Sequence, residues 1–275
     1  MTIWNTRIKI QYISDLHLEY KKFYPIINKL ADNLALCGDI GYPHSDWFKL
    51  FIKNQCKNFK NVFFVLGNHD LYMKSNNKQI EIYTIPDIIK ELERQDEEIP
   101  NFWFLNNNNI FIDRFNKVYR EKPIDISDEN LVNIIGTILW TDIDLNIAHR
   151  VNDYKKILIE KDKLLTPIDV KKMFQENVKF IQDTTQKYPN NKTVLLTHHA
   201  PHHKLNGKYI NGELQSAFST DLSFLLKSPI KVAISGHVHS VCSFYFNDVF
   251  LASNEYGYSK AEETGYDAVN SFVEI

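Results

Sequence analysis

This sequence has few cysteines and no long apolar run, and both features restrict the kind of protein that it can be. The 275 residues include three cysteines, an odd number without metal-type spacing, at Cys37, Cys56 and Cys242. This usage predicts reduced thiols in a cytoplasmic protein. No apolar run reaches membrane-spanning length. The first residues lack the apolar core of a signal peptide, so we expect no secretory leader.

A strong excess of charge of either sign is also missing. Lys and Arg number 32 against 34 Asp and Glu, which gives a formal net charge of −2. This near-neutral balance does not suggest a protein that coats nucleic acid or a membrane, although a local basic patch remains open. With 44% apolar and 24% charged residues, the composition is that of an ordinary globular protein. The length allows one large α/β domain or two small ones.

Short apolar runs rich in β-branched and aromatic residues predict buried strands. They occupy residues 8–13, 34–37, 62–66, 131–135, 194–197 and 232–235, and further strands are expected at 244–246, 249–252 and 271–275. Asn247-Asp248 suits a hairpin turn between two of the last strands. The asparagine run 106–109 is expected to be a turn, and the polar segment 113–130 an excursion from a hairpin.

Helix-start signals separate the early strands. Thr84 and Thr166 each precede a short segment with an Asp three residues later, which is typical of a capped helix start. Ser45 can cap another helix, and apolar residues at helical spacing predict one more within residues 23–30. The first half therefore alternates strand and helix while the end is mostly strands, which favours a layered α/β domain.

Residues of the types that bind metals gather where the predicted strands end. Functional groups collect beyond the carboxyl ends of strands in open α/β sheets, so we expect these segments to meet at one sheet edge. The five segments are Asp15-Leu16-His17, Gly38-Asp39, Gly67-Asn68-His69-Asp70, His198-His199 and Gly236-His237-Val238-His239.

The residue types in these segments favour a site for two metal ions. Oxygen and imidazole donors together favour Mn, Fe or Zn over Ca, and a carboxylate such as Asp39 can bridge two cations about 3.5–4 Å apart. Gly38, Gly67 and Gly236 each precede a candidate donor, where a Cβ would crowd the turn. Each segment alone fits a surface or turn role, but all five in succession favour a dinuclear site.

The ordered set of motifs resembles the calcineurin-like metallophosphoesterases, over residues 15–239. The resemblance implies a single domain over residues 1–275 with two packed mixed β-sheets flanked by helices and the active site at one edge. We expect residues 142–165 and 202–219 to form the rim of that site. The resemblance also implies one metal held by Asp15, His17 and His239, a second held by Asn68, His198 and His237, and a bridge through Asp39.

The same resemblance implies hydrolysis of phosphate esters. Two cations would bind the phosphoryl oxygens, and a bridging hydroxide would attack phosphorus in line with the leaving group. His69 would act as the general acid, and Asp70 would orient His69. We expect Mn²⁺, with Fe and Zn as alternatives. The expected substrate is a phosphorylated small molecule or nucleotide, with no membrane partner.

Further segments resemble small bacterial and phage members of the family. Residues 136–142 and Asn152-Asp153-Tyr154 are of this kind, although core or surface packing explains them equally well. Those members carry Asn-Pro-Arg-Gly-Tyr late in the chain, whereas residues 254–258 read Asn-Glu-Tyr-Gly-Tyr here. Tyr256 replaces the Arg, so a phosphate contact made by that Arg is not expected in this chain.

Two other functions remain open. A phosphodiesterase or nuclease would use the same metals with a basic, aromatic-lined rim. Tyr72, Lys204, Lys208 and Tyr209 are the candidates for such a rim. A non-enzymatic interaction module would have lost metal ligands, and none is lost here. The Gly-Asp-x-x-Asp-Arg-Gly motif of Ser/Thr protein phosphatases does not follow Gly38, which counts against that class.

Overall fold

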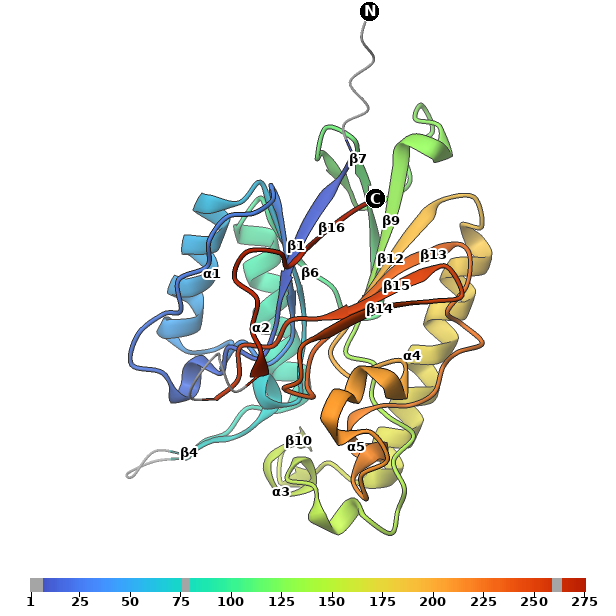
Figure 1. The fold of residues 1–275 in the computed structure, drawn as a ribbon. Coiled ribbons are helices and arrows are strands. Elements are labelled where there is room, and N and C mark those ends of the chain that lie inside the picture. The colour runs from blue at the N-terminus through green and yellow to red at the C-terminus, as the bar shows by residue number, and fades with distance from the viewer. Residues whose placement is uncertain (1–6, 76–79, 259–263) are drawn as a thin grey trace, which may run out of the picture.

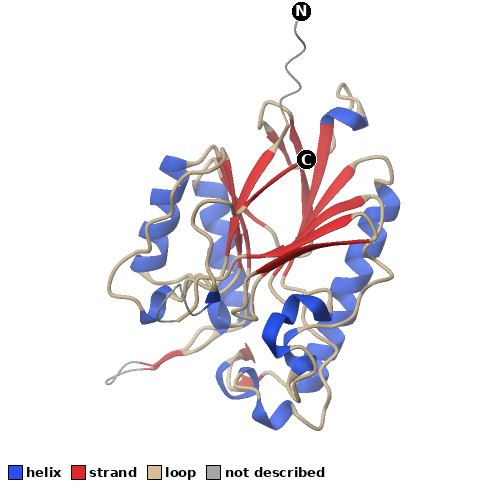
Figure 2. Ribbon diagram, in the orientation of Figure 1, coloured by secondary structure: helices blue, strands red, loops and turns tan. Residues whose placement is uncertain are grey.

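Two β-sheets face each other, and helices cover the outer face of each sheet (Figure 1 and Figure 2). The structure is a computed structural model and describes residues 7–75, 80–258 and 264–275. The arrangement confirms the predicted fold class of two packed mixed sheets flanked by helices. None of the helices in the described ranges has the length and hydropathy needed to span a bilayer.

The first sheet has five strands in the order β16-β1-β2-β3-β6. They are β16 (Phe272–Glu274), β1 (Lys9–Ile13), β2 (Asn33–Cys37), β3 (Asn61–Val65) and β6 (Phe102–Phe104). All run parallel except β16, which is antiparallel to β1. Side chains alternate between the faces of the sheet. In β2, Leu34 and Leu36 pack toward the helices, whereas Ala35 and Cys37 pack toward the second sheet.

The second sheet has seven strands in the order β14-β15-β13-β12-β9-β7-β8. They are β14 (Cys242–Phe246), β15 (Val249–Ser253), β13 (Ile230–Ser235), β12 (Lys192–Thr197), β9 (Leu131–Thr137), β7 (Asn108–Asp113) and β8 (Val118–Tyr119). The four strands β15, β13, β12 and β9 are parallel. Val194 and Leu196 of β12 face the first sheet, and Leu195 faces outward.

Three long helices begin at the residues that the sequence predicts. They are α1 (Asp46–Asn58), α2 (Ile85–Glu98) and α4 (Pro167–Lys187). Ser45 caps α1, and Thr84 and Thr166 form capping boxes with the Asp three residues later. Figure 1 shows α1 and α2 on the outer face of the first sheet and α4 on the outer face of the second.

The remaining elements are short and lie in the connections. Two ribbons pair β4 (Lys74–Ser75) with β5 (Ile80–Glu81) and β10 (Leu158–Glu160) with β11 (Lys163–Leu164). Two short α-helices are α3 (Asp153–Lys156) and α5 (Gln215–Phe218). Single 3-10 turns occupy Leu18–Tyr20, His69–Leu71, Asp128–Asn130 and Ala148–Arg150, and His203–Tyr209 is a longer 3-10 segment with a kink at Gly207.

Two predictions of local structure are wrong. Residues 23–30 contain no helix. Pro25 disfavours the helical conformation of the residue before it, and the Gln11 side chain bonds the backbone of Asn28 and Leu30 at 2.8 Å each. The predicted turn 106–109 is half strand, since Asn108 begins β7 and pairs with Gly136.

Candidate metal centre

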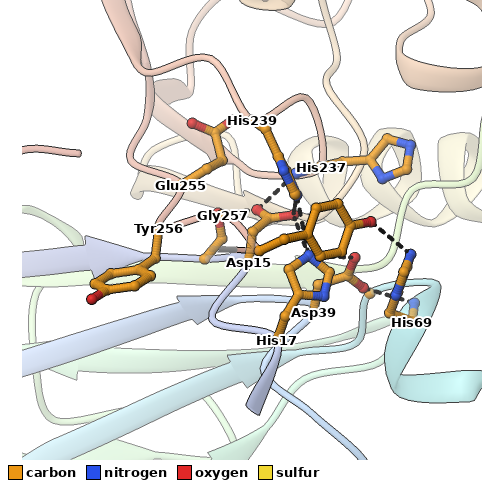
Figure 3. A network of polar contacts seen from close by, with 12 residues as sticks. Asp15, His17, Asp39, His69, His237, His239, Glu255, Tyr256 and Gly257 are labelled. Atoms are coloured by element: carbon orange, nitrogen blue, oxygen red, sulfur yellow. Dashed lines mark hydrogen bonds and ion pairs between the residues drawn. The ribbon is translucent and has the colours of Figure 1, made fainter. Parts of the chain in front are cut away.

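The first group of predicted ligands comes together at the ends of β1 and β13. One donor atom from each of Asp15, His17 and His239 lies within 4.8 Å of the other two. Nε2 of His239 is 3.2 Å from Oδ1 of Asp15 and 3.1 Å from Nε2 of His17. Figure 3 shows these side chains pointing toward one another. Two ring nitrogens and a carboxylate oxygen that share so small a volume offer a ready set of ligands.

The second group lies beside the first and comes from β2, β3, β12 and β13. Asp39, His198 and His237 offer donors within 4.8 Å of one another, and Oδ1 of Asn68 is 3.0 Å from Nε2 of His198. Asp39 faces both groups: its Oδ2 is 3.8 Å from Nε2 of His17 and its Oδ1 is 3.4 Å from Nε2 of His198. This is the place that a bridging carboxylate requires.

The backbone at the site is held in an unusual conformation. Five of the seven predicted ligands have positive φ, between 46° and 75°: Asp15, His17, Asp39, His237 and His239. A left-handed conformation costs roughly 1–2 kcal/mol for a residue with a Cβ, and such strain clusters at functional sites. Hydrogen bonds between the loops keep it in place. Asp15 N–H donates to the Gly38 carbonyl at 3.0 Å, and His17 N–H donates to the Asp39 carbonyl at 2.9 Å.

The glycines that precede the ligands leave room for donor atoms. A Cβ on Gly67 would lie 2.1 Å from Oδ1 of Asp39, and one on Gly236 would lie 2.5 Å from Oγ of Ser14. A Cβ on Gly38 would lie 2.4 Å from the His198 ring. These contacts are too short for any side chain, so the packed donors require glycine at these turns.

Hydrogen bonds to the outer ring nitrogens orient the histidines for metal binding. Nδ1 of His198 lies 3.0 Å from the Cys37 carbonyl oxygen, and Nδ1 of His17 lies 3.0 Å from Oε1 of Glu19. A proton on each Nδ1 leaves the lone pair of Nε2 facing the site. Burial lowers the pKa of His198 to about 3, and burial also lowers the pKa of His17 and His237. Neutral imidazole is the form that binds metals.

Taken together, the donors fit two transition-metal ions. Oδ1 of Asp15 is buried without a hydrogen-bond partner among the described residues, and burial favours the neutral form of the His17, His198 and His237 imidazoles. Burial and the nearby carboxylates of Asp15, Asp70 and Glu19 raise the pKa of Asp39, so a bound cation would favour its ionised form. Carboxylate, amide and imidazole donors suit Mn, Fe or Zn.

Comparisons with known proteins identify the family of this chain. Residues 8–241 match the sequence model of the calcineurin-like phosphoesterases. The chain belongs to this family. It is 31% identical over 277 residues to the uncharacterized protein L509 of Acanthamoeba polyphaga mimivirus, with 91% of each sequence covered.

Solved structures of other proteins share the fold of this family member. Phosphopantetheinyl hydrolase from Mycobacterium tuberculosis superposes with a TM-score of 0.66 at 14% identity, covering 98% of this chain and 96% of its own. A dimetal phosphatase from Danio rerio superposes with a TM-score of 0.51 at 10% identity, covering 92% of this chain and 88% of its own. At these identities the likeness concerns the fold alone.

Asp70 makes contacts that differ from those expected of it. Its carboxylate accepts hydrogen bonds from three backbone N–H groups, those of Gly67 at 2.8 Å, Gly41 at 2.9 Å and Asp39 at 3.0 Å. Among the described contacts, none joins Asp70 to the His69 ring. Asp70 therefore ties the turn after β2 to the turn after β3, and its role in orienting His69 stays a prediction.

Two residues that the sequence interpretation missed contact the His69 ring instead. Nδ1 of His69 is 3.5 Å from Oε1 of Glu19, and Nε2 is 3.1 Å from the hydroxyl of Tyr258. The Tyr258 ring also stacks on His17, with centroids 4.2 Å apart. Glu19 continues the series of polar residues at every second position that begins with Asp15 and His17. Tyr258 is the last residue of the segment 254–258. Those positions are the signals that could have identified them.

A third missed residue orients the amide ligand. Oδ1 of Asp153 accepts from Nδ2 of Asn68 at 2.9 Å and from the Tyr72 hydroxyl at 2.6 Å. With its NH₂ group bound to this buried carboxylate, Asn68 turns its oxygen toward His198. Tyr256 points its ring away from the metal centre in Figure 3.

Replacing Glu19 by Gln is expected to weaken metal binding by 10–100-fold, the range typical for partners of ligating histidines. Burial opposes ionisation of Glu19, but its bonds to His17 and His69 outweigh burial and lower its pKa to about 2. The variant loses this charge. Titration of chelator-treated protein with Mn²⁺ measures the change, and Glu93→Gln on the exposed face of α2 is the control. Equal affinity in Glu19→Gln and wild type would contradict the assigned role.

Proposed function

We propose that this protein hydrolyses phosphate esters with two bound metal ions. The observation that supports the proposal is the convergence of seven donor side chains from five segments, with Asp39 facing both groups. Family membership favours the same activity. Each group alone would suit one ion, but a carboxylate shared between two adjacent groups is the arrangement of dinuclear hydrolases.

Named residues of the chain would hold the ions. The first ion would be bound by Asp15, His17 and His239, and the second would be bound by Asn68, His198 and His237. Asp39 would bind both ions. The ions, Mn²⁺ first and Fe or Zn as alternatives, would supply charge for the phosphoryl oxygens and acidify a water nucleophile. The Asp70 and Asp153 hydrogen bonds fix the geometry of the site before substrate binds.

His69 is placed to deliver a proton to the leaving oxygen. Its side chain is 13% exposed and lines the pocket beside the metal centre. Glu19 lies 3.5 Å from its Nδ1 and the Tyr258 hydroxyl lies 3.1 Å from its Nε2, and these two contacts define the orientation of the ring. A departing alkoxide requires protonation more than a departing nitrophenolate does, so the contribution of His69 depends on the leaving group.

The test of the function compares two esters in the presence and absence of metal. The Mn²⁺-loaded protein is expected to hydrolyse 4-nitrophenyl phosphate and phenyl phosphate, and a chelator is expected to abolish both activities. In His69→Ala, kcat for phenyl phosphate should fall roughly 100-fold or more. The value for 4-nitrophenyl phosphate should fall much less, because nitrophenolate leaves without protonation.

His149→Ala provides the matched control, since His149 is an exposed histidine near the rim. No turnover with Mn²⁺, Fe²⁺ or Zn²⁺ would refute the phosphoesterase proposal. Equal slowing of both esters in His69→Ala would refute only the role of His69 as the acid.

A further inference from the structure

A pocket of about 380 Å³ opens directly beside the metal centre. Its floor includes Asp39, Asn68, His69, His237 and His239. Its volume lies at the lower end of the roughly 300–1,000 Å³ that small-molecule sites span. A phosphoryl group held at the floor would therefore leave space for a compact alcohol portion and little more.

One wall of this pocket is apolar and lies next to His237, a predicted metal ligand. It consists of Val151, Leu214, Ala217, Phe218 and Val238. The Phe218 ring lies 5.2 Å from the His237 ring, and the Ala217 carbonyl oxygen is 3.3 Å from Nε2 of His237. The alcohol portion of a bound ester would thus extend from the metal centre along apolar side chains.

All of the wall except Val238 comes from the two segments predicted to form the rim, residues 142–165 and 202–219, and these segments are joined. The backbone N–H of Asp144 donates to the hydroxyl of Ser216 at 3.0 Å, and that of Asp142 donates at 2.9 Å to the hydroxyl of Thr220, which directly follows the second segment. A third link is the ion pair between Arg150 and Glu213. Because three links hold the segments together, the wall keeps its shape and can select by fit.

The charges around the pocket do not suit a polyanion. Among the described lining residues, Arg150 is the side chain with a permanent positive charge, and Glu213 neutralises it at 2.7 Å. Lys204, a candidate for a nucleic-acid groove, does not line this pocket, although Tyr72 does. The side chains of Lys208 and Tyr209 lie outside the described residues. Binding of single strands combines a positively charged groove with stacking platforms, and this pocket offers no such groove.

We infer that the pocket selects phosphate esters with a compact, uncharged and largely apolar alcohol portion, in preference to nucleotides with several phosphates or to nucleic acids. The inference rests on the proposed phosphoesterase activity. Apolar contact with the wall would favour the substrate by burying its hydrocarbon surface. A second phosphate would have to compete with Glu213 for Arg150, the permanently charged cation among the described lining residues.

A series of n-alkyl phosphates tests this selection, because primary alcohols of different length are similarly poor leaving groups. With Mn²⁺-loaded protein, kcat/KM is expected to rise at least about tenfold from methyl to butyl phosphate, since one methylene in an apolar pocket is worth 10–200-fold. ADP and an oligothymidylate should be poorer substrates than butyl phosphate.

Variants at the wall show whether the pocket causes the rise. Leu214→Asp and Leu214→Ala should lower the butyl-to-methyl ratio of kcat/KM, a ratio that does not depend on the fraction of protein folded. Leu145→Asp, at a 56% exposed leucine of the same rim outside the pocket, should leave the ratio unchanged.

Each outcome bears on a different claim. Equal turnover along the alkyl series, or a preference for ADP or the oligonucleotide, would overturn the inference while the phosphoesterase function stands. An unchanged ratio in both Leu214 variants would also overturn it. Absence of turnover for every ester would overturn the proposed function, and with it the inference.

Discussion

Replacing Asp39 by Asn is expected to lower metal-dependent kcat/KM at least about 10³-fold. Removing one preorganised electrostatic group from an active site costs roughly 10²–10³-fold, and this carboxylate faces both donor groups. In the wild type, the backbone N–H of His69 donates to Oδ1 of Asp39 at 2.8 Å. Asn has the same shape as Asp and keeps an oxygen that can accept this hydrogen bond. The change therefore removes charge with little effect on packing. Steady-state kinetics with 4-nitrophenyl phosphate and Mn²⁺ measure the loss.

Folding and metal content separate this effect from a general defect. Burial and neighbouring carboxylates raise the pKa of Asp39, so the metal-free variant should unfold at the same temperature as metal-free wild type or a higher one. The variant should also retain less than two equivalents of metal. Asp183→Asn, at an exposed residue of α4, is the control. Turnover within tenfold of wild type in Asp39→Asn would show that this residue does not bridge the metals.

Removing the metals is expected to destabilise the folded protein by several kcal/mol. Residues with positive φ and buried acids are crowded together at the site. Each of them lowers the stability of the folded protein unless a cation offsets its cost. A ligand that binds only the folded state at a thousand times its Kd adds about 4 kcal/mol. Thermal unfolding with and without a chelator, followed by Mn²⁺ addition, measures the difference. An unchanged Tm would contradict a preformed metal centre.

The sequence identified the features that depend on neighbours along the chain. Strand positions followed from apolar runs, because a buried strand has to be apolar on both faces. The starts of α2 and α4 followed from Thr84 and Thr166, because a cap involves residues three apart. Candidate donors followed from strand ends, because parallel strands of one sheet end at the same edge. The helix expected at residues 23–30 failed because its backbone bonds to Gln11, which is distant in sequence.

Only the tertiary structure decided which residues act on the donors. Glu19 reaches His69, Asp153 reaches Asn68 and Tyr258 reaches His69 across separations of 50, 85 and 189 residues. Asp70 adjoins His69 in sequence, yet it accepts hydrogen bonds from the backbone amides of Gly67 in its own turn and of Asp39 and Gly41 in the turn after β2. Side-chain hydrogen bonds need atoms within about 3 Å in a suitable direction. Such distances arise from the packing of two sheets, so local sequence patterns carry no record of them.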